Sequence, residues 1–169
     1  MSDRSAEEIE RLGAWLRTEA AARSVEEIFA LVQEEMSEMY AATRAIPEAQ
    51  LQLVPPGEEW SPLRVLQHAV QTNVQVAEDV LNVCLTGLRP GNPEPALAAD
   101  REALINKQDE ANASLWEHVS FAQPDAFLDV TWPHPFFGEL NWREWFLFLH
   151  MHAWDHRHQI AALGEKLSA

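Results

Sequence analysis

The chain has 169 residues, of which 47% are hydrophobic, and its 27 acidic side chains against 12 Lys and Arg give a formal net charge of −15 at pH 7. This charge repels nucleic acid backbones and anionic membrane surfaces, so neither is expected as a partner. The single cysteine, Cys84, lies in an apolar stretch and predicts a buried thiol. We expect a soluble cytoplasmic protein, because the N-terminal segment lacks a signal-peptide pattern and no stretch reaches the roughly 18 apolar residues of a membrane span.

Helical periodicity dominates the first part of the chain, where apolar residues recur every three or four positions. Ser5 with Glu8 and Ser24 with Glu27 have the spacing of capping boxes, in which side chains at both ends of the first turn bind free backbone N–H groups. The pattern predicts a short leading helix after Ser5 and a first long helix after Ser24.

The middle of the chain predicts two further long helices. Ser61-Pro62 has the form of an N-cap followed by proline in the first turn, and the helix that it begins should end near Leu88. Residues 89–95, RPGNPEP, predict a loop, and the Ala- and Glu-rich segment over about 97–121 predicts the next helix.

The last part of the chain predicts an aromatic loop and a final helix. Residues 131–138, TWPHPFFG, contain two prolines and a glycine, which exclude a regular helix and indicate an irregular loop. Asn141 and Glu144 form another capping pair, which opens the fourth long helix. The expected fold is therefore all-α: a four-helix bundle over residues 24–169, preceded by an N-terminal helical extension, residues 1–23.

Four of the seven histidines fall in this last helix, within the stretch HMHAWDHRHQI. Positions four apart share a helix face, so His152 and His156 point the same way. Both lie in an apolar stripe that is expected to face the bundle interior and whose other members are Trp142, Trp145, Leu149, Ile160, Leu163 and Leu167. His150 and His158 project onto a second, weaker stripe.

The second stripe, with Leu147, Met151 and Trp154, requires a second packing partner. Either the leading helix or another subunit could supply it. We therefore predict a homodimer, with the leading helix as the alternative.

The His152 and His156 pair has two interpretations. Two imidazoles four residues apart can offer two nitrogen ligands to one transition metal. The alternative is a pair of core histidines hydrogen-bonded to neighbours, but burying two unpaired imidazoles is costly. A metal would need a third ligand, and His68, His118 and His134 are the candidates.

Two separated stretches resemble the DinB-like (DinB/YfiT-type) family of metal-binding four-helix-bundle proteins. They are EEWSPLRVLQH at 58–68 and HPFFGELNWREWFLFLHMHAWDHRHQI at 134–160, with the patterns W-S-x-x-x-V-L-x-H and H-x-x-x-H-x-x-Q-I. Lengths and loop positions agree over most of residues 24–165. The resemblance thus covers the predicted bundle and leaves the leading helix outside.

The resemblance implies that His68, His152 and His156 bind a divalent metal ion, zinc or nickel. His68 lies away from the centre of the apolar face of its predicted helix. A site that includes it should therefore lie near the rim of the bundle and open to a cleft, which suits exchangeable water.

Neighbouring residues are candidates for a supporting role around this site. Metal-binding imidazoles usually donate their second N–H to a carboxylate or carbonyl oxygen, and Asp155 and Gln159 flank the pair. The pocket is expected to be shaped by residues in or beside loops, namely Trp60, Trp132, His134 and Phe137.

The functional prediction is a divalent-metal-binding protein with an uncertain transferase or hydrolase activity on a small-molecule substrate. The resemblance implies thiol-dependent S-transferases and isomerases that use bacillithiol or mycothiol, so a low-molecular-weight thiol is a second expected cofactor. A thiol with carboxylates needs a cationic contact, for which Arg64, Arg143 and Arg157 are the candidates. The alternatives are a non-catalytic metal-binding module and a metal-free dimerisation domain.

Overall fold

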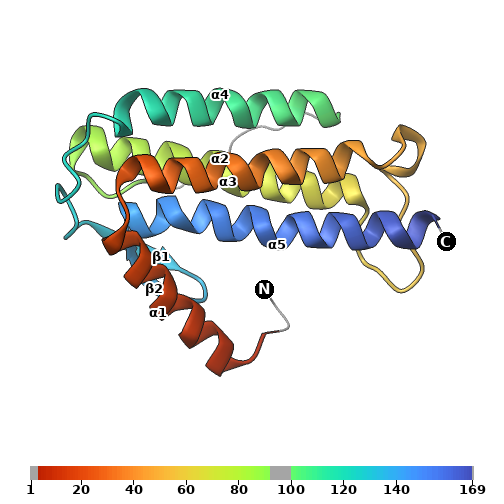
Figure 1. Ribbon diagram of the computed structural model, residues 1–169, viewed down its shortest axis with the longest axis horizontal. Helices are drawn as coiled ribbons and strands as arrows, with labels where there is room; N and C mark the ends of the chain where they lie inside the picture. The colour runs from red at the N-terminus through yellow and green to blue at the C-terminus, as the bar shows by residue number, and fades with distance from the viewer. Residues whose placement is uncertain (1–3, 92–99, 169) are drawn as a thin grey trace.

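The computed structural model describes residues 4–91 and 100–168, and this part of the chain is mostly helical. Its elements, in chain order, are α1 (Ala6–Ala22), α2 (Val25–Arg44), the 3-10 turn η1 (Glu48–Gln50), α3 (Pro62–Thr86), α4 (Arg101–Val119), β1 (Thr131–His134), β2 (Gly138–Asn141) and α5 (Trp142–Ser168). The long helices α2 to α5 form a bundle in which α2 and α5 run one way and α3 and α4 the other (Figure 1). The expected all-α four-helix bundle is confirmed. The loop prediction for 89–95 extends beyond the described residues.

The helices begin at the caps that the sequence indicates. Ser5 and Ser24 each accept a hydrogen bond from the backbone N–H three residues later, and the glutamates there complete both capping boxes. Ser61 caps α3, with Pro62 in the first turn, and α3 ends at Gly87, whose φ of 66° is readily adopted by glycine. Local sequence therefore sets where these helices begin and end.

The core lies between α5 and its two main neighbours, α2 and α3, while α4 packs mainly on α3. Trp142, Phe146 and Leu149 of α5 are almost fully buried. The Cys84 thiol is partly buried against this core, and burial raises its pKa to about 12. Within the described ranges, no helix is both long enough and apolar enough to cross a membrane.

The segment predicted as an irregular aromatic loop is instead a β-hairpin. Trp132 of β1 pairs with Leu140 of β2, and His134 pairs with Gly138. Side chains that alternate along a strand explain why Trp132 and His134 are buried while Pro133 between them is exposed. The loop prediction was wrong because two prolines masked a short strand with this two-residue period.

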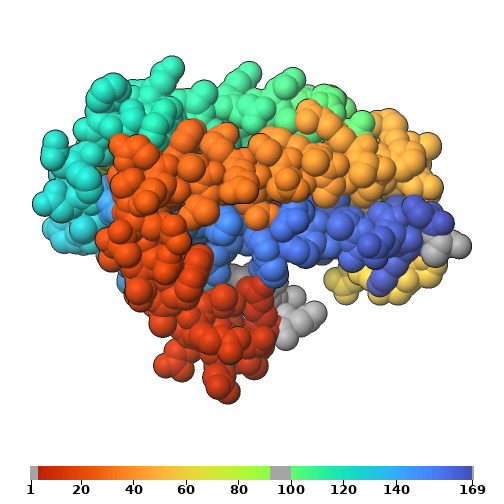
Figure 2. Space-filling model, viewed as in Figure 1, coloured from red at the N-terminus to blue at the C-terminus, as the bar shows by residue number. Residues whose placement is uncertain are grey.

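The leading helix α1 lies against α5 and the hairpin and protrudes from the bundle (Figures 1 and 2). Leu12 and Trp15 of α1 line a cleft of about 370 Å³ together with Met151 and Trp154 of α5. The second stripe of α5 therefore faces α1 within the chain, across this cleft. Trp15 and Trp154 are still exposed beside this cleft, and the homodimer stays a prediction.

Arg143, in the first turn of α5, anchors the C-terminal end of α1. Its buried guanidinium donates to the carbonyl oxygen of Ala20 from Nε at 3.0 Å and from Nη2 at 2.8 Å, and it also donates to those of Arg23 and Pro124. The last carbonyls of a helix lack partners within the helix and carry partial negative charge, so a cation stabilises them.

Candidate metal centre

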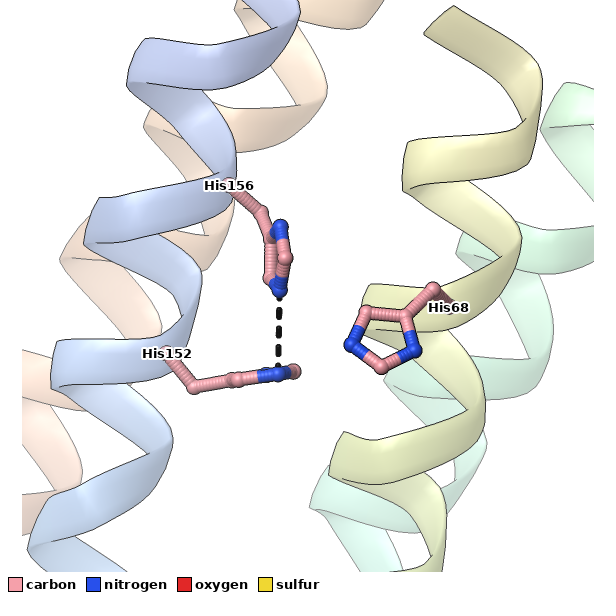
Figure 3. A group of neighbouring side chains, drawn as sticks. All are labelled: His68, His152 and His156. Atoms are coloured by element: carbon pink, nitrogen blue, oxygen red, sulfur yellow. Dashed lines mark hydrogen bonds between the residues drawn. The ribbon is translucent and has the colours of Figure 1, made fainter. Parts of the chain in front are cut away.

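Three histidines from two helices meet at one side of the bundle. His68 projects from α3, while His152 and His156 project from α5 towards it (Figure 3). One ring nitrogen of each lies within 4.8 Å of the others. The ring centroid of His68 lies 5.6 Å from that of His152 and 5.0 Å from that of His156. The structure therefore brings together the three residues that the resemblance implies as ligands.

Amide side chains set the tautomers of the two α5 histidines. Nδ1 of His152 lies 2.8 Å from Oδ1 of Asn73 on α3, and Nδ1 of His156 lies 3.0 Å from Oε1 of Gln159. An amide oxygen can only accept, so each Nδ1 carries the proton of its neutral ring. Both Nε2 atoms then present lone pairs, and these atoms face each other at 3.1 Å, the contact drawn dashed in Figure 3.

Two facing lone pairs repel each other unless a cation lies between them. A tetrahedral zinc ion with Zn–N bonds of about 2.0–2.1 Å holds neighbouring ligand nitrogens about 3.3 Å apart. The separation of 3.1 Å between the Nε2 atoms of His152 and His156 is close to that value. Because all three histidine nitrogens lie within 4.8 Å of one another, small ring rotations would complete the set. The three residues fit a divalent transition-metal ion.

A metal-free arrangement of the same groups requires a different Asn73. If its amide were turned by 180°, Nδ2 would donate to His152, which could then donate to His156. In the structure, Nδ2 of Asn73 is buried and has no hydrogen-bond partner among the described residues. The orientation of this amide thus separates the two interpretations of the sequence, a metal site and a hydrogen-bonded core pair.

Burial keeps all three histidines neutral at neutral pH. Desolvation lowers the pKa of His152 well below its ordinary value, and the neighbouring imidazoles of His156 and His68 lower it further. The same burial lowers the pKa of His156 to about 4. Desolvation, followed by the nearby charge of Arg64, lowers the pKa of His68. Metals bind neutral imidazole, so no proton has to be displaced near pH 7.

The three histidines line an open cleft of about 720 Å³. His152 is buried, whereas His68 and His156 are partly exposed, as expected for a site at the bundle rim. The other lining residues are Gly57, Glu58, Glu59, Trp60, Thr72, His134, Pro135, Phe136, Trp145, Phe148 and Gln159. Among the described residues, no additional carboxylate, thiol or imidazole joins the three-histidine group.

The structure brings only some of the supporting candidates to this cleft. Trp60, His134 and Gln159 line it. Asp155 instead pairs with Arg4 on the α1 side of α5, because its position on the helix turns it away from His68.

Two aromatic candidates also lie elsewhere. Trp132 is buried on the hairpin face that meets α5, where it stacks on Trp145 with ring centroids 5.5 Å apart. Phe137 is turned towards α1, where its ring would meet a Cβ atom added to Gly13 at 3.3 Å. The expected pocket role of Phe137 falls to its neighbour Phe136, which lies at the hairpin turn and lines the cleft.

Asn73 is the site residue that the sequence analysis missed. It is fully buried on α3, in a helix face that is otherwise apolar. An amide at such a position needs a polar partner, and this was the available signal. Its partner, His152, is 79 residues away in the sequence, so spacing alone could not connect them.

Comparisons with known proteins agree with this architecture. A family model described as the DinB superfamily matches residues 30–160, a range that includes all three histidines. A solved structure described as "Crystal structure of TT2238, a four-helix bundle protein" is 26% identical, with a TM-score of 0.64, and the match covers 82% of this chain and 99% of that one. No curated protein matches. With more than half of its length matched by the family model, this chain belongs to the DinB superfamily.

Proposed function

We propose that the chain binds one divalent metal ion, zinc or nickel, through His68, His152 and His156 and uses it in a transferase or hydrolase reaction on a small molecule. The observation that carries this proposal is the pair of Nε2 atoms at 3.1 Å, whose lone pairs are set by Asn73 and Gln159. This arrangement is unfavourable without a cation and favourable with one. A site built for packing alone has no reason to adopt it.

Two features favour catalysis over a purely structural metal. Structural zinc sites usually have four protein ligands, whereas catalytic sites have three and keep a position for water or substrate. The described residues supply three ligands, and the site borders an open cleft. When bound there, a divalent ion would supply Lewis acidity that lowers the pKa of a water or thiol in the cleft.

The residues of the chain have separate tasks in this proposal. Asn73 and Gln159 hold the two α5 imidazoles in the metal-binding tautomer, since each accepts the Nδ1 proton. The rings of Trp60, Phe136 and Phe148 line the cleft and provide apolar contacts for a substrate.

The nature of the thiol is constrained by the positions of the three candidate arginines. Arg143 binds backbone carbonyls at the end of α1, and Arg157 pairs with Glu35. The Arg64 guanidinium lies 5.6 Å from the centre of the Trp60 ring. None of them lines the cleft. This favours an uncharged thiol over one that carries carboxylates.

Metal content of protein purified without an affinity tag tests the proposal. Elemental mass spectrometry should find about one zinc or nickel ion per chain, and His68→Ala, His152→Ala and His156→Ala should each lose it. His150→Ala and His158→Ala are matched controls on the same helix and should retain it. The metal-site proposal fails if the wild type binds no ion after incubation with either metal at neutral pH, or if the controls lose metal equally.

A further inference from the structure

His134 lies at the end of β1 and lines the cleft without belonging to the three-histidine group. Its Nδ1 is 3.1 Å from the backbone N of Phe136 and 3.2 Å from that of Phe137. A ring nitrogen that accepts from N–H groups carries no proton itself, so the proton of the neutral ring is on Nε2. The hairpin turn therefore fixes His134 as a donor through Nε2.

Nε2 of His134 has no hydrogen-bond acceptor among the residues that the structure describes. The His134 side chain is 5% exposed and is enclosed by the rings of Phe137, Trp145 and Phe148, at centroid distances of 4.6, 5.0 and 4.6 Å. No residue in the described ranges accepts a hydrogen bond from its Nε2. Desolvation lowers the pKa of His134 to about 4, so the ring stays neutral near pH 7. The His134 side chain lines the cleft, so an acceptor atom of a ligand there could take the hydrogen bond that Nε2–H offers.

The cleft also indicates what kind of acceptor suits this donor. Its described lining contains no Lys or Arg, while Glu58 and Glu59 lie among its residues. Apart from a metal ion on the three histidines, the lining offers no cation to pair with a second, anionic group of the ligand, so an uncharged oxygen is favoured beside His134. The Phe148 ring lies 4.6 Å from the His134 ring and 5.3 Å from the His152 ring. Both imidazoles therefore contact the same aromatic ring, so a small ligand could reach His134 and the three-histidine group together.

We propose that Nε2–H of His134 donates a hydrogen bond to an uncharged carbonyl oxygen of the substrate. The cleft would then select neutral carbonyl compounds with a metal-binding atom a short chain away. A neutral imidazole donor of this kind can both position a carbonyl and polarise it. This inference rests on the proposed function, because it takes the three-histidine group as the other anchor of the ligand.

Two variants separate the donor role of His134 from its role in the turn. Asn at position 134 can accept from the turn N–H groups through Oδ1, as in an Asx turn, but it cannot reach the position of Nε2. Gln at position 134 places an amide N–H near the position of Nε2 but loses the acceptor for the turn. If His134 only stabilises the turn, His134→Gln should reduce ligand binding more than His134→Asn does. If His134 donates to the ligand, His134→Asn should reduce binding more.

Three thiols probe binding to the protein loaded with Co²⁺, whose thiolate absorption band reports the complex. Methyl 3-mercaptopropionate carries an uncharged carbonyl, 1-pentanethiol has the same chain length without oxygen, and 3-mercaptopropionate is anionic. His134→Asn should lower the affinity for the ester by about fivefold, as expected for one lost hydrogen bond. Its affinity for pentanethiol should stay within about twofold of the wild-type value. His134→Gln should leave both nearly unchanged, and the anionic thiol should bind more weakly than the ester.

The possible outcomes are distinct. Equal weakening of ester and pentanethiol in His134→Asn, or no weakening of either, overturns the inference. Tighter binding of the anionic thiol than of the ester overturns the selection of uncharged ligands. If Co²⁺ itself does not bind, the proposed metal site has failed, which is a different result.

A second measurement does not depend on the variants folding. In the zinc-loaded wild type, NMR of ¹⁵N-labelled histidine should show His134 with a protonated Nε2 and an unprotonated Nδ1. The Nε2–H resonance should move on addition of the ester and stay in place with pentanethiol. A proton on Nδ1 would contradict the inference directly.

Discussion

The two faces of α5 that carry histidines use polar groups differently. On the face towards α3, His152 and His156 are linked to amides that set their tautomers and turn their lone pairs towards His68. On the face towards α1, Met151 and Trp154 line an apolar cleft opposite Leu12 and Trp15. One helix thus carries a chemical face and a packing face. Residue type alone does not distinguish them, whereas the partners do.

The largest expected effect comes from breaking the packing face at Arg143. Arg143→Met removes charge-assisted hydrogen bonds to the carbonyls at the end of α1 and should lower the free energy of unfolding by roughly 3 kcal/mol. Metal affinity should change little, because Arg143 does not line the cleft. Chemical denaturation and amide hydrogen exchange of α1 would measure this. Arg11→Met is an exposed change on α1, and its free energy of unfolding should stay within about 0.5 kcal/mol of the wild-type value.

Asn73 is the equivalent test on the chemical face. Asn73→Leu leaves Nδ1–H of His152 without an acceptor and should lower metal affinity by about 10- to 100-fold, the usual effect of losing a partner behind a metal ligand. Competition with a chelator would measure it. Asn73→Asp, whose side chain can only accept, should retain the metal affinity. Gln159→Leu should lower the metal affinity less than Asn73→Leu does, because Gln159 is exposed and water can replace its amide. Equal affinities for wild type and Asn73→Leu would contradict the tautomer argument.

The pH dependence of the metal-free protein sharpens the comparison. The pKa of His156 is about 4 in the folded state, below its ordinary value, and those of His68 and His152 are also lowered. The unfolded chain therefore binds more protons between about pH 4 and 6.5, so stability should rise with pH across that window and level off above it. Denaturation in the presence of a chelator at several pH values would measure this rise.

Asp79 acts in the opposite direction and supplies a control. Desolvation raises its pKa to about 6, so the folded state binds more protons on its account and stability falls as pH rises. Asp79→Asn should therefore make the rise of stability with pH steeper. A flat or falling profile in this variant would show that the buried histidines are not neutral.

The smallest effect is expected at Asp155, the carboxylate next to His156 in the sequence. It forms an ion pair with Arg4 on the packing face, and such a pair contributes about 0.5 kcal/mol. Asp155→Asn should thus cause a small loss of stability with no change in metal affinity. A loss of affinity like that of Asn73→Leu would place Asp155 in the metal site after all.

The sequence predicted most of the fold because its signals are local. Capping pairs such as Ser24 with Glu27 and the proline after Ser61 act within one helical turn, and the structure has each of them. The hairpin was missed because its pairing joins Trp132 to Leu140 across a turn whose prolines resemble an ordinary loop. Short strands take their stability from partners and weakly from their own residues.

The candidate site was predictable in part for the same reason. The spacing of His152 and His156 on one helix could be seen directly, whereas His68 required a resemblance to a known family. The partner of His152 came from another helix. Phe137 was expected where Phe136 lies, because both residues are in the hairpin turn, whose geometry decides which side chain reaches the cleft. Residues that act through contacts across the bundle are invisible to local periodicity.

The hairpin turn has one further consequence, for coordination number. Four imidazoles border the cleft, yet the backbone N–H groups of Phe136 and Phe137 occupy Nδ1 of His134 and leave the proton on Nε2. To become a ligand, His134 would have to give up both backbone hydrogen bonds or lose its remaining proton. The turn therefore disfavours His134 as a ligand, and the described residues offer three histidines as one group. If a four-coordinate metal ion binds there as proposed, one place would remain for an exogenous molecule, and a main-chain turn would help to keep it open.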